Sequence, residues 1–459
     1  MVSGLPTRID SGMESLVLRP DQHDALDAIT TRLLSDSRAQ HISACGTGKT
    51  VVAIATAEHL NARTVLVLVP NLALMGQTIA SWRRWTARSM AAVCSDDDVV
   101  RRGEDDLSVD DAEWECPVLH SSSEISEWWT AQHPTVLFST YQSLHLVEAA
   151  GGHVDLLIAD EAHWLVTAGE QGHLRSVQSL NADMRLFQTA TPRIGAGQTM
   201  EEPSIFGHIA YEMTFAQAIR LGIIADYRLI ILELTGAAPL DDTWESRLAV
   251  SVEALRQLHR DWPAKRTLVY ANRVAHAEEF AEHTGCTVIT GQMPASRREP
   301  ILQRFRDDGG VIANVRCLNE GVDVPDLDAI LFAEPRSGVV DVTQSIGRVL
   351  RRKPDGRRGI IVLPVFASPE DDDPYAKIVD TLQVMTSMDG RLRQTLTQRA
   401  STNGPAADGE PDVHIEGSDP ARVQELLTAV RGKIGLRETN LSNLIELDEL
   451  VSWVTGAAA

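Results

Sequence analysis

The chain has 459 residues, of which 43% are hydrophobic and only 5% aromatic, and its formal net charge is −22. This length suits two or three domains rather than one, and the apolar content is sufficient to fill their cores. No apolar run reaches the roughly 20 residues that a membrane-spanning helix needs, and the first ten residues lack the basic-then-apolar pattern of a signal peptide. We therefore expect a cytoplasmic protein without a membrane partner. Five widely spaced cysteines indicate neither a disulfide framework nor a zinc module.

Strand and helix patterns alternate along two successive halves of the chain. The strands expected in the first half are His41–Ile42, Thr64–Val69, Val136–Ser139, Leu156–Ala159 and Leu186–Thr189. The strands expected in the second half are Thr267–Tyr270, Thr287–Thr290, Val311–Asn314, Ala329–Ala333 and Gly359–Leu363. Each set predicts an α/β domain with a doubly wound parallel sheet covered by helices.

A glycine-containing loop follows the first expected strand and precedes an expected helix from Val51 to Leu60. It consists of Ser43, Ala44, Cys45, Gly46, Thr47, Gly48, Lys49 and Thr50. Glycines allow backbone N–H groups to close around phosphate, Lys49 can reach the β- and γ-phosphates of a nucleotide, and Thr50 can offer its hydroxyl to Mg²⁺. The helix N-terminus would face the same phosphates. Ser43 stands where the general pattern has its first glycine, so the turn must form without positive-φ freedom at that residue.

Two carboxylates, Asp160 and Glu161, directly follow the mostly apolar run Val154–Ala159. This run is typical of a buried parallel strand, and ligands of open α/β sheets bind beyond the carboxyl ends of the strands. Asp160 is suited to hold Mg²⁺, directly or through water, and Glu161 to orient and deprotonate an attacking water. An Asp-Glu pair that caps a helix is the ordinary alternative, but the strand and the phosphate loop favour catalysis.

Several more strings resemble motifs of one family in the correct order, over roughly residues 18–360. Asp160 to His163 and Thr189 to Pro192 are two of them, and the remainder are Arg19–Gln22, Val67–Gln77, Phe138–Leu144, Leu268–Asn272, Asn319–Pro325 and Gln344–Arg351. Together they resemble the superfamily 2 helicases and translocases of the DEAH-box type. Thr189–Arg193 and the stretch from Phe206 to Tyr227 resemble the branch that contains type III restriction subunits and DNA-repair helicases, which favours DNA over RNA.

The resemblance implies two tandem RecA-like domains, which we place at residues 1–225 and 226–400, before a linker and small helical extension at 401–459. It implies that ATP and Mg²⁺ are the cofactors. The residues that it implies for nucleotide binding are Gln22, Ser43, Ala44, Cys45, Gly46, Thr47, Gly48, Lys49, Thr50 and Asp323. The residues that it implies for binding the metal are Thr50 and Asp160. The implied catalytic residues are Lys49, Asp160, Glu161, Gln344, Arg348 and Arg351.

The second domain is expected to supply arginines to the first. Arg348 and Arg351 are three residues apart, so on a helix both would point the same way. By resemblance they reach the γ-phosphate, where such a residue can be worth about 10³–10⁵ in rate. Thr189 and Thr191 would connect the nucleotide site to domain movement, and Thr140 and the loop around Asn71 would contact nucleic acid.

The negative charge is concentrated in an acidic insert at about residues 94–133. Between residues 94 and 127 the sequence has twelve acidic side chains and two arginines. The two arginine-rich stretches 297–306 and 348–358 are candidates for a positive groove that grips nucleic acid. The insert and two amphipathic helices, near Asp419–Ile434 and Leu441–Val454, are candidate sites for protein partners. A solvated loop and docking on the motor domains are the ordinary alternatives.

These patterns predict an ATP-dependent DNA helicase or translocase that couples hydrolysis to movement on, or unwinding of, nucleic acid. One alternative is an ATP-gated nucleic-acid-binding switch in a repair, restriction or defence complex. Another alternative is an RNA helicase. Nothing after residue 363 has the clustered acidic-Lys pattern of a nuclease.

Overall fold

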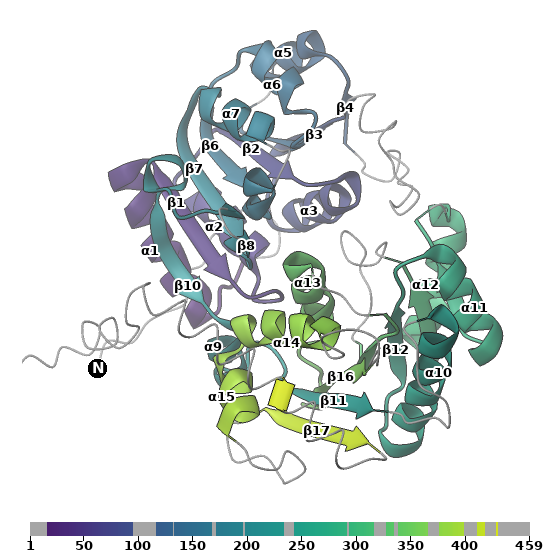
Figure 1. Cartoon of the computed structure of the whole chain (residues 1–459). Coiled ribbons are helices and arrows are strands. Elements are labelled where there is room, and N and C mark those ends of the chain that lie inside the picture. Colours follow the sequence, from purple (N-terminus) through teal and green to yellow (C-terminus); the bar gives the residue numbers. More distant parts are fainter. Residues whose placement is uncertain are drawn as a thin grey trace, which may run out of the picture.

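The computed structural model describes residues 16–94, 116–131, 133–167, 171–195, 198–233, 243–291, 293–315, 327–334, 338–365, 376–398, 411–417 and 428–429. Their strands form two all-parallel sheets, one in each of two lobes, and one small antiparallel pair (Figure 1). The expected α/β fold with two doubly wound sheets is therefore confirmed. Among the described residues, no helix combines the length and apolar character needed to cross a membrane.

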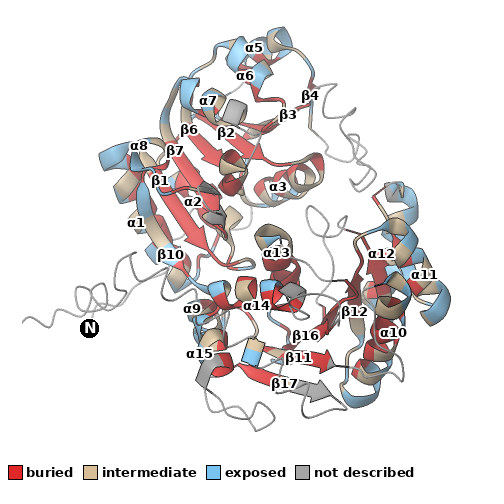
Figure 2. Ribbon diagram, in the orientation of Figure 1, coloured by how far each residue is buried: buried red, intermediate tan, exposed pale blue. Residues whose placement is uncertain are grey.

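The first lobe contains an eight-stranded sheet in the order β10-β1-β7-β6-β2-β5-β3-β4. Its strands are β1 Arg38–Ser43, β2 Thr64–Val69, β3 Ser89–Val93, β4 Val118–Leu119, β5 Thr135–Thr140, β6 Val154–Ala159, β7 Ala182–Thr189 and β10 His208–Met213. Every residue of β2 and β5 is buried because both faces of the sheet are covered, as Figure 2 shows in red. This burial explains why these strands are continuously apolar rather than alternating.

Helices cover both faces of the first sheet. They are α1 Pro20–Asp36, α2 Lys49–His59, α3 Leu72–Trp85, α5 Ser122–Ala131, α6 Leu144–Ala150, the 3₁₀ helix η2 Ala162–Val166, α7 Gln171–Ser179 and α8 Pro203–Phe206. Helix α9, Phe215–Arg220, follows β10 and instead contributes Phe215 and Ala218 to the buried cluster of the second lobe. One buried cluster includes Ile29 of α1 and Trp82 of α3, and a second includes Trp129 of α5 and Leu144 of α6. The sheet is therefore the middle of three layers. A small hairpin, β8 Arg193–Gly195 with β9 Gln198–Thr199, follows the end of β7.

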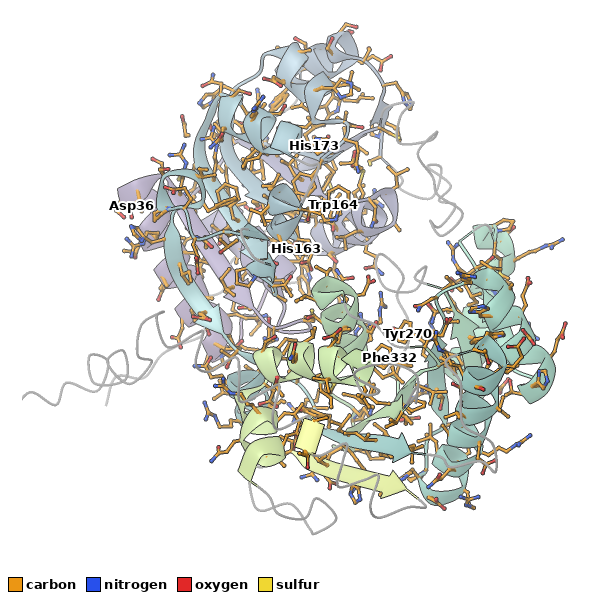
Figure 3. The ribbon with its side chains drawn as sticks, in the orientation of Figure 1. Asp36, His163, Trp164, His173, Tyr270 and Phe332 are labelled. Atoms are coloured by element: carbon orange, nitrogen blue, oxygen red, sulfur yellow. The ribbon has the colours of Figure 1, made fainter. Side chains whose placement is uncertain are left out.

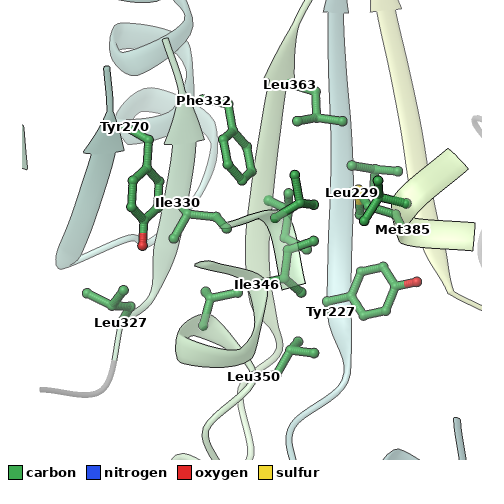
Figure 4. Close-up of a cluster of buried hydrophobic side chains, with 14 of the residues drawn as sticks. Tyr227, Leu229, Tyr270, Leu327, Ile330, Phe332, Ile346, Leu350, Leu363 and Met385 are labelled. Carbon is green, nitrogen blue, oxygen red and sulfur yellow. The ribbon is translucent and has the colours of Figure 1, made fainter. Parts of the chain in front are cut away.

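The second lobe contains a seven-stranded sheet in the order β13-β14-β12-β15-β16-β11-β17. Its strands are β11 Tyr227–Glu233, β12 Arg266–Tyr270, β13 Thr287–Ile289, β14 Gly310–Asn314, β15 Ala329–Phe332, β16 Gly359–Pro364 and β17 Asp412–Gly417. Its helices are α10 Trp244–Asp261, α11 Val274–Thr284, α12 Ala295–Asp308, α13 Val339–Val349, α14 Ala376–Met388 and α15 Gly390–Gln398. Figure 4 shows the cluster on one face, where the rings of Tyr270 and Phe332 stack with centroids 5.5 Å apart.

One expectation about the connecting segments is wrong. The stretch 401–417 was expected to be a polar linker, but its last six residues form β17, which pairs in parallel with β11. The strand forms because Val413 is buried and because Asp412 accepts hydrogen bonds from Arg228 and Arg358 at its start. In the described end of the acidic insert, β4 pairs with β3 and α5 buries Ile125.

Other expected features lie outside the described residues. They are residues 95–115 of the acidic insert, the Asn319–Pro325 string with Asp323, and the two amphipathic helices, apart from residues 428–429 in the first of them. The described part of the insert includes helix α5.

Candidate nucleotide site between the two lobes

The strand order of the first sheet brings the suspected functional loops together. Strands β1, β7, β6, β2 and β5 are successive neighbours and are all parallel. Their carboxyl ends therefore lie along one edge, where open α/β sheets bind ligands. The phosphate loop follows β1, Thr189 ends β7, Asp160 follows β6, and Asn71 and Tyr141 lie just after β2 and β5.

The phosphate loop closes on two glycines. Gly46 has φ +83° and Gly48 has φ +92°, both in the left-handed region that favours glycine. Ser43 is the last residue of β1, so the absence of glycine there leaves the turn intact. Lys49 begins α2, and its Nζ donates to the backbone oxygen of Ser43 at 3.1 Å. Thr50 occupies the first turn of the same helix, beside the backbone N–H groups that anions bind.

Gln22 lies against the phosphate loop from the first turn of α1. Its side-chain oxygen accepts from the backbone N–H of Arg19 at 3.1 Å, and its Nε2 lies 3.5 Å from the backbone oxygen of Thr47. A Cβ on Gly48 would approach Gln22 Nε2 to 2.5 Å, so the loop glycine permits this close packing. The suspected adenine-reading residue is thus adjacent to the suspected phosphate-binding residues.

The two carboxylates after β6 have different environments. Burial and the neighbouring charge of Glu161 raise the pKa of Asp160. Burial also acts to raise the pKa of Glu161, but Lys49 and a hydrogen bond from His163 outweigh it and the pKa is lowered. Burial acts to lower the pKa of Lys49, and the carboxylates of Glu161 and Asp160 outweigh it, so that pKa is raised. The site therefore keeps a charged lysine beside an ionised Glu161.

The backbone of Glu161 is in an uncommon conformation. Its φ is +47° and its ψ +48°, which places a non-glycine residue in the left-handed region. Its backbone N–H donates to Asp160 Oδ1 at 3.0 Å. Such conformations cost about 1–3 kcal/mol and cluster at functional sites. No pattern in the sequence indicated this conformation.

His163 joins the carboxylates to the end of β7. It is buried, and its Nδ1 lies 2.9 Å from Thr189 Oγ1, 3.2 Å from Thr191 Oγ1 and 3.3 Å from Glu161 Oε2. Figure 3 shows His163 and Trp164 on the side of the first lobe that faces the second. These contacts connect the expected water-activating residue to the expected coupling threonines.

Tyr141 joins the carboxylates to the end of β5. Its buried hydroxyl donates to the backbone oxygen of Asp160 at 2.7 Å, and its ring stacks on Trp164 with an interplanar angle of 6°. Sequence reasoning placed Tyr141 in a nucleic-acid-binding string but did not anticipate this contact with the carboxylate loop.

Helix α13 of the second lobe packs directly on the phosphate loop (Figure 1). A Cβ on Gly347 would lie 2.4 Å from Cys45 Cβ, so only glycine allows this approach. Ala44 belongs to the same buried apolar cluster as Ile346 and Leu350 of the second lobe. The phosphate loop is therefore part of the interface between the lobes.

The arginines expected to act in trans lie near this contact. Gln344 and Arg348 are one turn apart on α13, and Arg348 is 8% exposed. The helix ends at Val349 and Leu350 is its C-cap, so Arg351 lies just beyond the helix and not on it as expected. Burial raises the pKa of the Cys45 thiol, while the charges of Lys49, Arg348 and Arg351 act against this rise. Both arginines are thus electrostatic neighbours of the phosphate loop.

The residues that could hold a divalent metal fit Mg²⁺. Thr50 offers a hydroxyl and Asp160 a carboxylate, and hard oxygen donors are the ligands that Mg²⁺ prefers. Among the described residues, a group of at least three possible metal ligands occurs at the opposite edge of the sheet: His153, Asp155 and Asp183. There Asp155 already accepts from the backbone N–H of Thr64 at 3.0 Å.

Several side chains that were expected to contact nucleic acid make hydrogen bonds or ion pairs within the protein. Asn71 Oδ1 caps α3 by accepting from the backbone N–H of Leu74 at 2.9 Å, and Thr140 Oγ1 accepts from the N–H of Ser143 at 3.1 Å. Arg357 pairs with Asp355, and Arg358 pairs with Asp226 and Asp412 in the second lobe. Arg357 and Arg358 thus already have carboxylate partners, and a positive groove along residues 348–358 stays a prediction.

Two protein families match the chain. The type III restriction enzyme res subunit family matches residues 15–194, and the helicase conserved C-terminal domain matches residues 250–353. A probable helicase of African swine fever virus is 27% identical over 396 residues, which is 82% of this chain and 44% of the relative. The DNA 3'-5' translocase XPB2 of Sulfurisphaera tokodaii is 24% identical over 392 residues, covering 74% of this chain and 80% of the relative. The chain thus spans less than half the length of the viral relative.

Two solved structures share the fold. The ATP-dependent type ISP restriction-modification enzyme LlaBIII, bound to DNA, has a TM-score of 0.75 at 23% identity, over 92% of this chain and 33% of that chain. Dbp5 of S. cerevisiae, bound to RNA and ADP BeF3, has a TM-score of 0.51 at 14% identity, over 91% of this chain and 98% of that chain. Both solved structures thus share with this chain the RecA-like arrangement of two lobes with parallel sheets. The first part of the chain is thus similar to the type III restriction enzyme res subunit family, and the second part to the helicase conserved C-terminal domain, in the order of the two lobes.

Proposed function

We propose that this chain is an ATP-dependent DNA translocase or helicase, and that residues 1–225 and 226–400 are its two motor domains. One observation carries the proposal: helix α13 of the second lobe contacts the phosphate loop of the first through Gly347 and Cys45. A site assembled from two lobes couples a change at the nucleotide to a change in lobe position. The DNA 3'-5' translocase relative and the DNA-bound restriction enzyme neighbour support DNA as the track.

In this proposal the phosphate loop binds the nucleotide. Backbone N–H groups of residues 46–50 and the Lys49 ammonium hold the phosphates, Gln22 lies where an adenine could be read, and Thr50 with Asp160 would hold Mg²⁺. A Mg²⁺ ion held by these residues would neutralise charge that develops on the phosphate oxygens. Asp323 is proposed to contact the ribose or the domain interface.

Hydrolysis is proposed to use a base from the first lobe and cations from the second. Glu161, kept ionised by Lys49 and His163, is suited to orient a water and take its proton. Arg348 and Arg351 would stabilise the charge of the leaving phosphate, with Gln344 beside them on α13. After hydrolysis the attraction between these arginines and the γ-phosphate is lost, and the lobes can separate.

The contacts of His163 provide the link between chemistry and movement. A shift of Glu161 on phosphate release changes the position of the His163 ring, whose Nδ1 also contacts Thr189 and Thr191. The threonines lie at the end of β7, immediately before the β8–β9 hairpin. Tyr141 gives a second connection, from the carboxylate loop to the end of β5.

The test measures ATP hydrolysis without nucleic acid and with single-stranded DNA, duplex DNA or RNA. We expect stimulation by DNA, loss of turnover in Lys49→Ala, retained ATP binding without cleavage in Glu161→Gln, and retained binding without hydrolysis in Arg351→Ala. The exposed neighbour Arg352 provides a matched control, since Arg352→Ala should hydrolyse ATP at the normal rate in the absence of nucleic acid. Wild-type turnover by Glu161→Gln would contradict its role as the base.

Strand displacement and triplex displacement separate the two kinds of DNA motor. Strand displacement indicates unwinding, and triplex displacement without it indicates translocation along the duplex. Intact hydrolysis with neither activity would instead favour an ATP-gated binding switch, and stimulation by RNA alone would favour an RNA helicase.

A further inference from the structure

Three polar side chains lie in a row across adjacent strands, next to the start of α2. His41 of β1 is directly in register with Gln188 of β7 and with Tyr211 of β10. Residues in register on neighbouring strands point to the same face of a sheet. His41 is 2% exposed and Gln188 is 1% exposed, and the Tyr211 ring meets the His41 ring edge-on at 5.8 Å. The hydrolysis mechanism described above leaves His41 and Gln188 without a role.

The carbonyl of Lys49 fixes the direction of every hydrogen bond in this row. Gln188 Nε2 lies 3.2 Å from the backbone oxygen of Lys49 and 2.8 Å from His41 Nδ1. A carbonyl oxygen only accepts, so the atom of Gln188 that faces Lys49 must be the amide nitrogen. The same nitrogen donates to His41 Nδ1, which therefore accepts. The His41 proton is then on Nε2, which donates to Ser43 Oγ at 2.8 Å.

The histidine must be neutral for this arrangement. Burial, assisted by the nearby charge of Lys49, lowers the pKa of His41 to about 3. The ring therefore keeps one accepting and one donating nitrogen at neutral pH. A buried polar group of this kind is costly to leave without its partners.

The hydrogen bonds of His41 and Gln188 end on three segments of the nucleotide site. Ser43 is the residue from which the phosphate loop leaves β1, and its backbone oxygen accepts from Lys49 Nζ. Lys49 is the first residue of α2. Gln188 directly precedes Thr189, whose hydroxyl contacts His163 on the way to Glu161.

We propose that His41 and Gln188 are positioning residues that hold the phosphate loop in a fixed place relative to the strand that carries Thr189. Ser43, which replaces the first glycine of the general pattern, is the third member because its hydroxyl accepts from His41. The inference rests on the proposed function, since it concerns the same nucleotide site. Loss of the network should leave the fold intact while allowing the loop more conformations, which weakens nucleotide binding.

The two histidine nitrogens can be tested separately. In His41→Asn the amide oxygen can replace Nδ1 as the acceptor for Gln188, and in His41→Gln the amide nitrogen can replace Nε2 as the donor to Ser43. His41→Phe loses both bonds while retaining an aromatic ring, and Gln188→Met removes the donor with little change in volume. Ser43→Ala removes only the acceptor hydroxyl.

The experiment measures equilibrium binding of a fluorescent ADP analogue, together with kcat and KM for ATP. We expect His41→Phe and Gln188→Met to bind about 5- to 30-fold more weakly, the range that corresponds to about 1–2 kcal/mol. His41→Asn and His41→Gln should each show a smaller loss. Ser43→Ala should weaken binding further in the His41→Gln background and should have no further effect in the His41→Asn background, which has already lost that bond.

Gln40 provides the matched control on the same strand. It is also buried and hydrogen-bonded, through Nε2 to the backbone oxygens of Met200 and Gly207, but on the other face of β1. Gln40→Met should lower the thermal unfolding midpoint and leave nucleotide affinity unchanged. If His41→Phe and Gln188→Met behave in the same way as Gln40→Met, the network only stabilises the fold and the proposal is refuted.

Hydrogen exchange separates this inference from the proposed function. If the wild type fails to bind any nucleotide, the proposed function fails, but the backbone amides of residues 43–50 can still be followed. Faster exchange of these amides in Gln188→Met than in Gln40→Met supports the positioning role. Equal exchange in the two variants overturns it.

Discussion

Replacing Gly347 with alanine should hold the two lobes apart. The new Cβ would lie 2.4 Å from Cys45 Cβ and 3.2 Å from Cys45 Sγ. Carbon atoms in contact are normally about 3.5–4.0 Å apart, so α13 must move away from the phosphate loop by about 1 Å. Overpacking of this kind costs about 1–3 kcal/mol. That energy corresponds to a shift of about 5- to 150-fold in the equilibrium for closure of the lobes.

The assay is steady-state ATP hydrolysis, because in the proposed mechanism the arginines of the second lobe act only when the lobes are closed. We expect kcat of Gly347→Ala to fall by about 5- to 150-fold, in proportion to the closed fraction. The thermal unfolding midpoint should not fall, because alanine is favoured over glycine inside a helix by about 1 kcal/mol. Gly338→Ala, at the N-cap of the same helix, is a suitable control since its Cβ would lie 3.4 Å from Asp341 Oδ2.

A second substitution at Cys45 identifies the clash. Cys45→Gly removes the Cβ that the methyl group introduced by Gly347→Ala would strike, and it should restore hydrolysis to the Gly347→Ala protein. Cys45→Ala retains that Cβ and should not restore hydrolysis. Normal hydrolysis by Gly347→Ala alone would refute the inference that α13 reaches the phosphate loop during turnover.

Three further predictions concern other contacts. Tyr141→Phe removes the hydrogen bond to the backbone oxygen of Asp160 but keeps the ring. One such bond contributes about 1 kcal/mol, so steady-state kinetics should show a several-fold lower kcat with unchanged nucleotide affinity. Asp412→Ala leaves Arg228 without its buried partner at the start of β17, so urea unfolding should show a second lobe less stable by about 1–3 kcal/mol. His41 has a folded pKa of about 3 against 6.5 ordinarily, so below pH 6.5 the unfolded chain binds the additional proton and stability falls on acidification. Between about pH 8 and pH 5 this residue should account for a loss of about 2 kcal/mol, and urea unfolding of His41→Gln at both pH values should lack that part of the loss.

Features encoded by consecutive residues could be predicted from the sequence. The phosphate loop from Ser43 to Thr50 and the strand that ends at Ala159, just before Asp160, each lie in one short string. Their spacing alone indicates the turn, the helix start and the carboxyl end of a strand. Strands β3, β4, β10, β11 and β17 were not anticipated. Strands β4, β10 and β17 lie at sheet edges and lack a long continuous apolar run, whereas β3 and β11 lie inside their sheets and have no such explanation.

Features that depend on distant residues could not be predicted. The register that places His41 beside Gln188 and the approach of Gly347 to Cys45 join residues that are far apart in the chain. No local pattern records such a contact. The end of α13 before Arg351 was missed for a related reason, since spacing indicates a common helical face only while the helix continues.

The end of β7 explains how one strand can serve two parts of the site. Successive side chains of a strand point to opposite faces. Gln188 therefore faces His41 and the first residue of α2, while Thr189 faces His163. The phosphate loop and the carboxylate loop are held from the two faces of one backbone segment, so neither can shift far without moving the other. Thr191 and the β8–β9 hairpin directly follow this segment in the chain. In the proposed mechanism, a displacement of the end of β7 would therefore also displace the hairpin. The contacts at the nucleotide site would then be sufficient to couple the nucleotide to the hairpin.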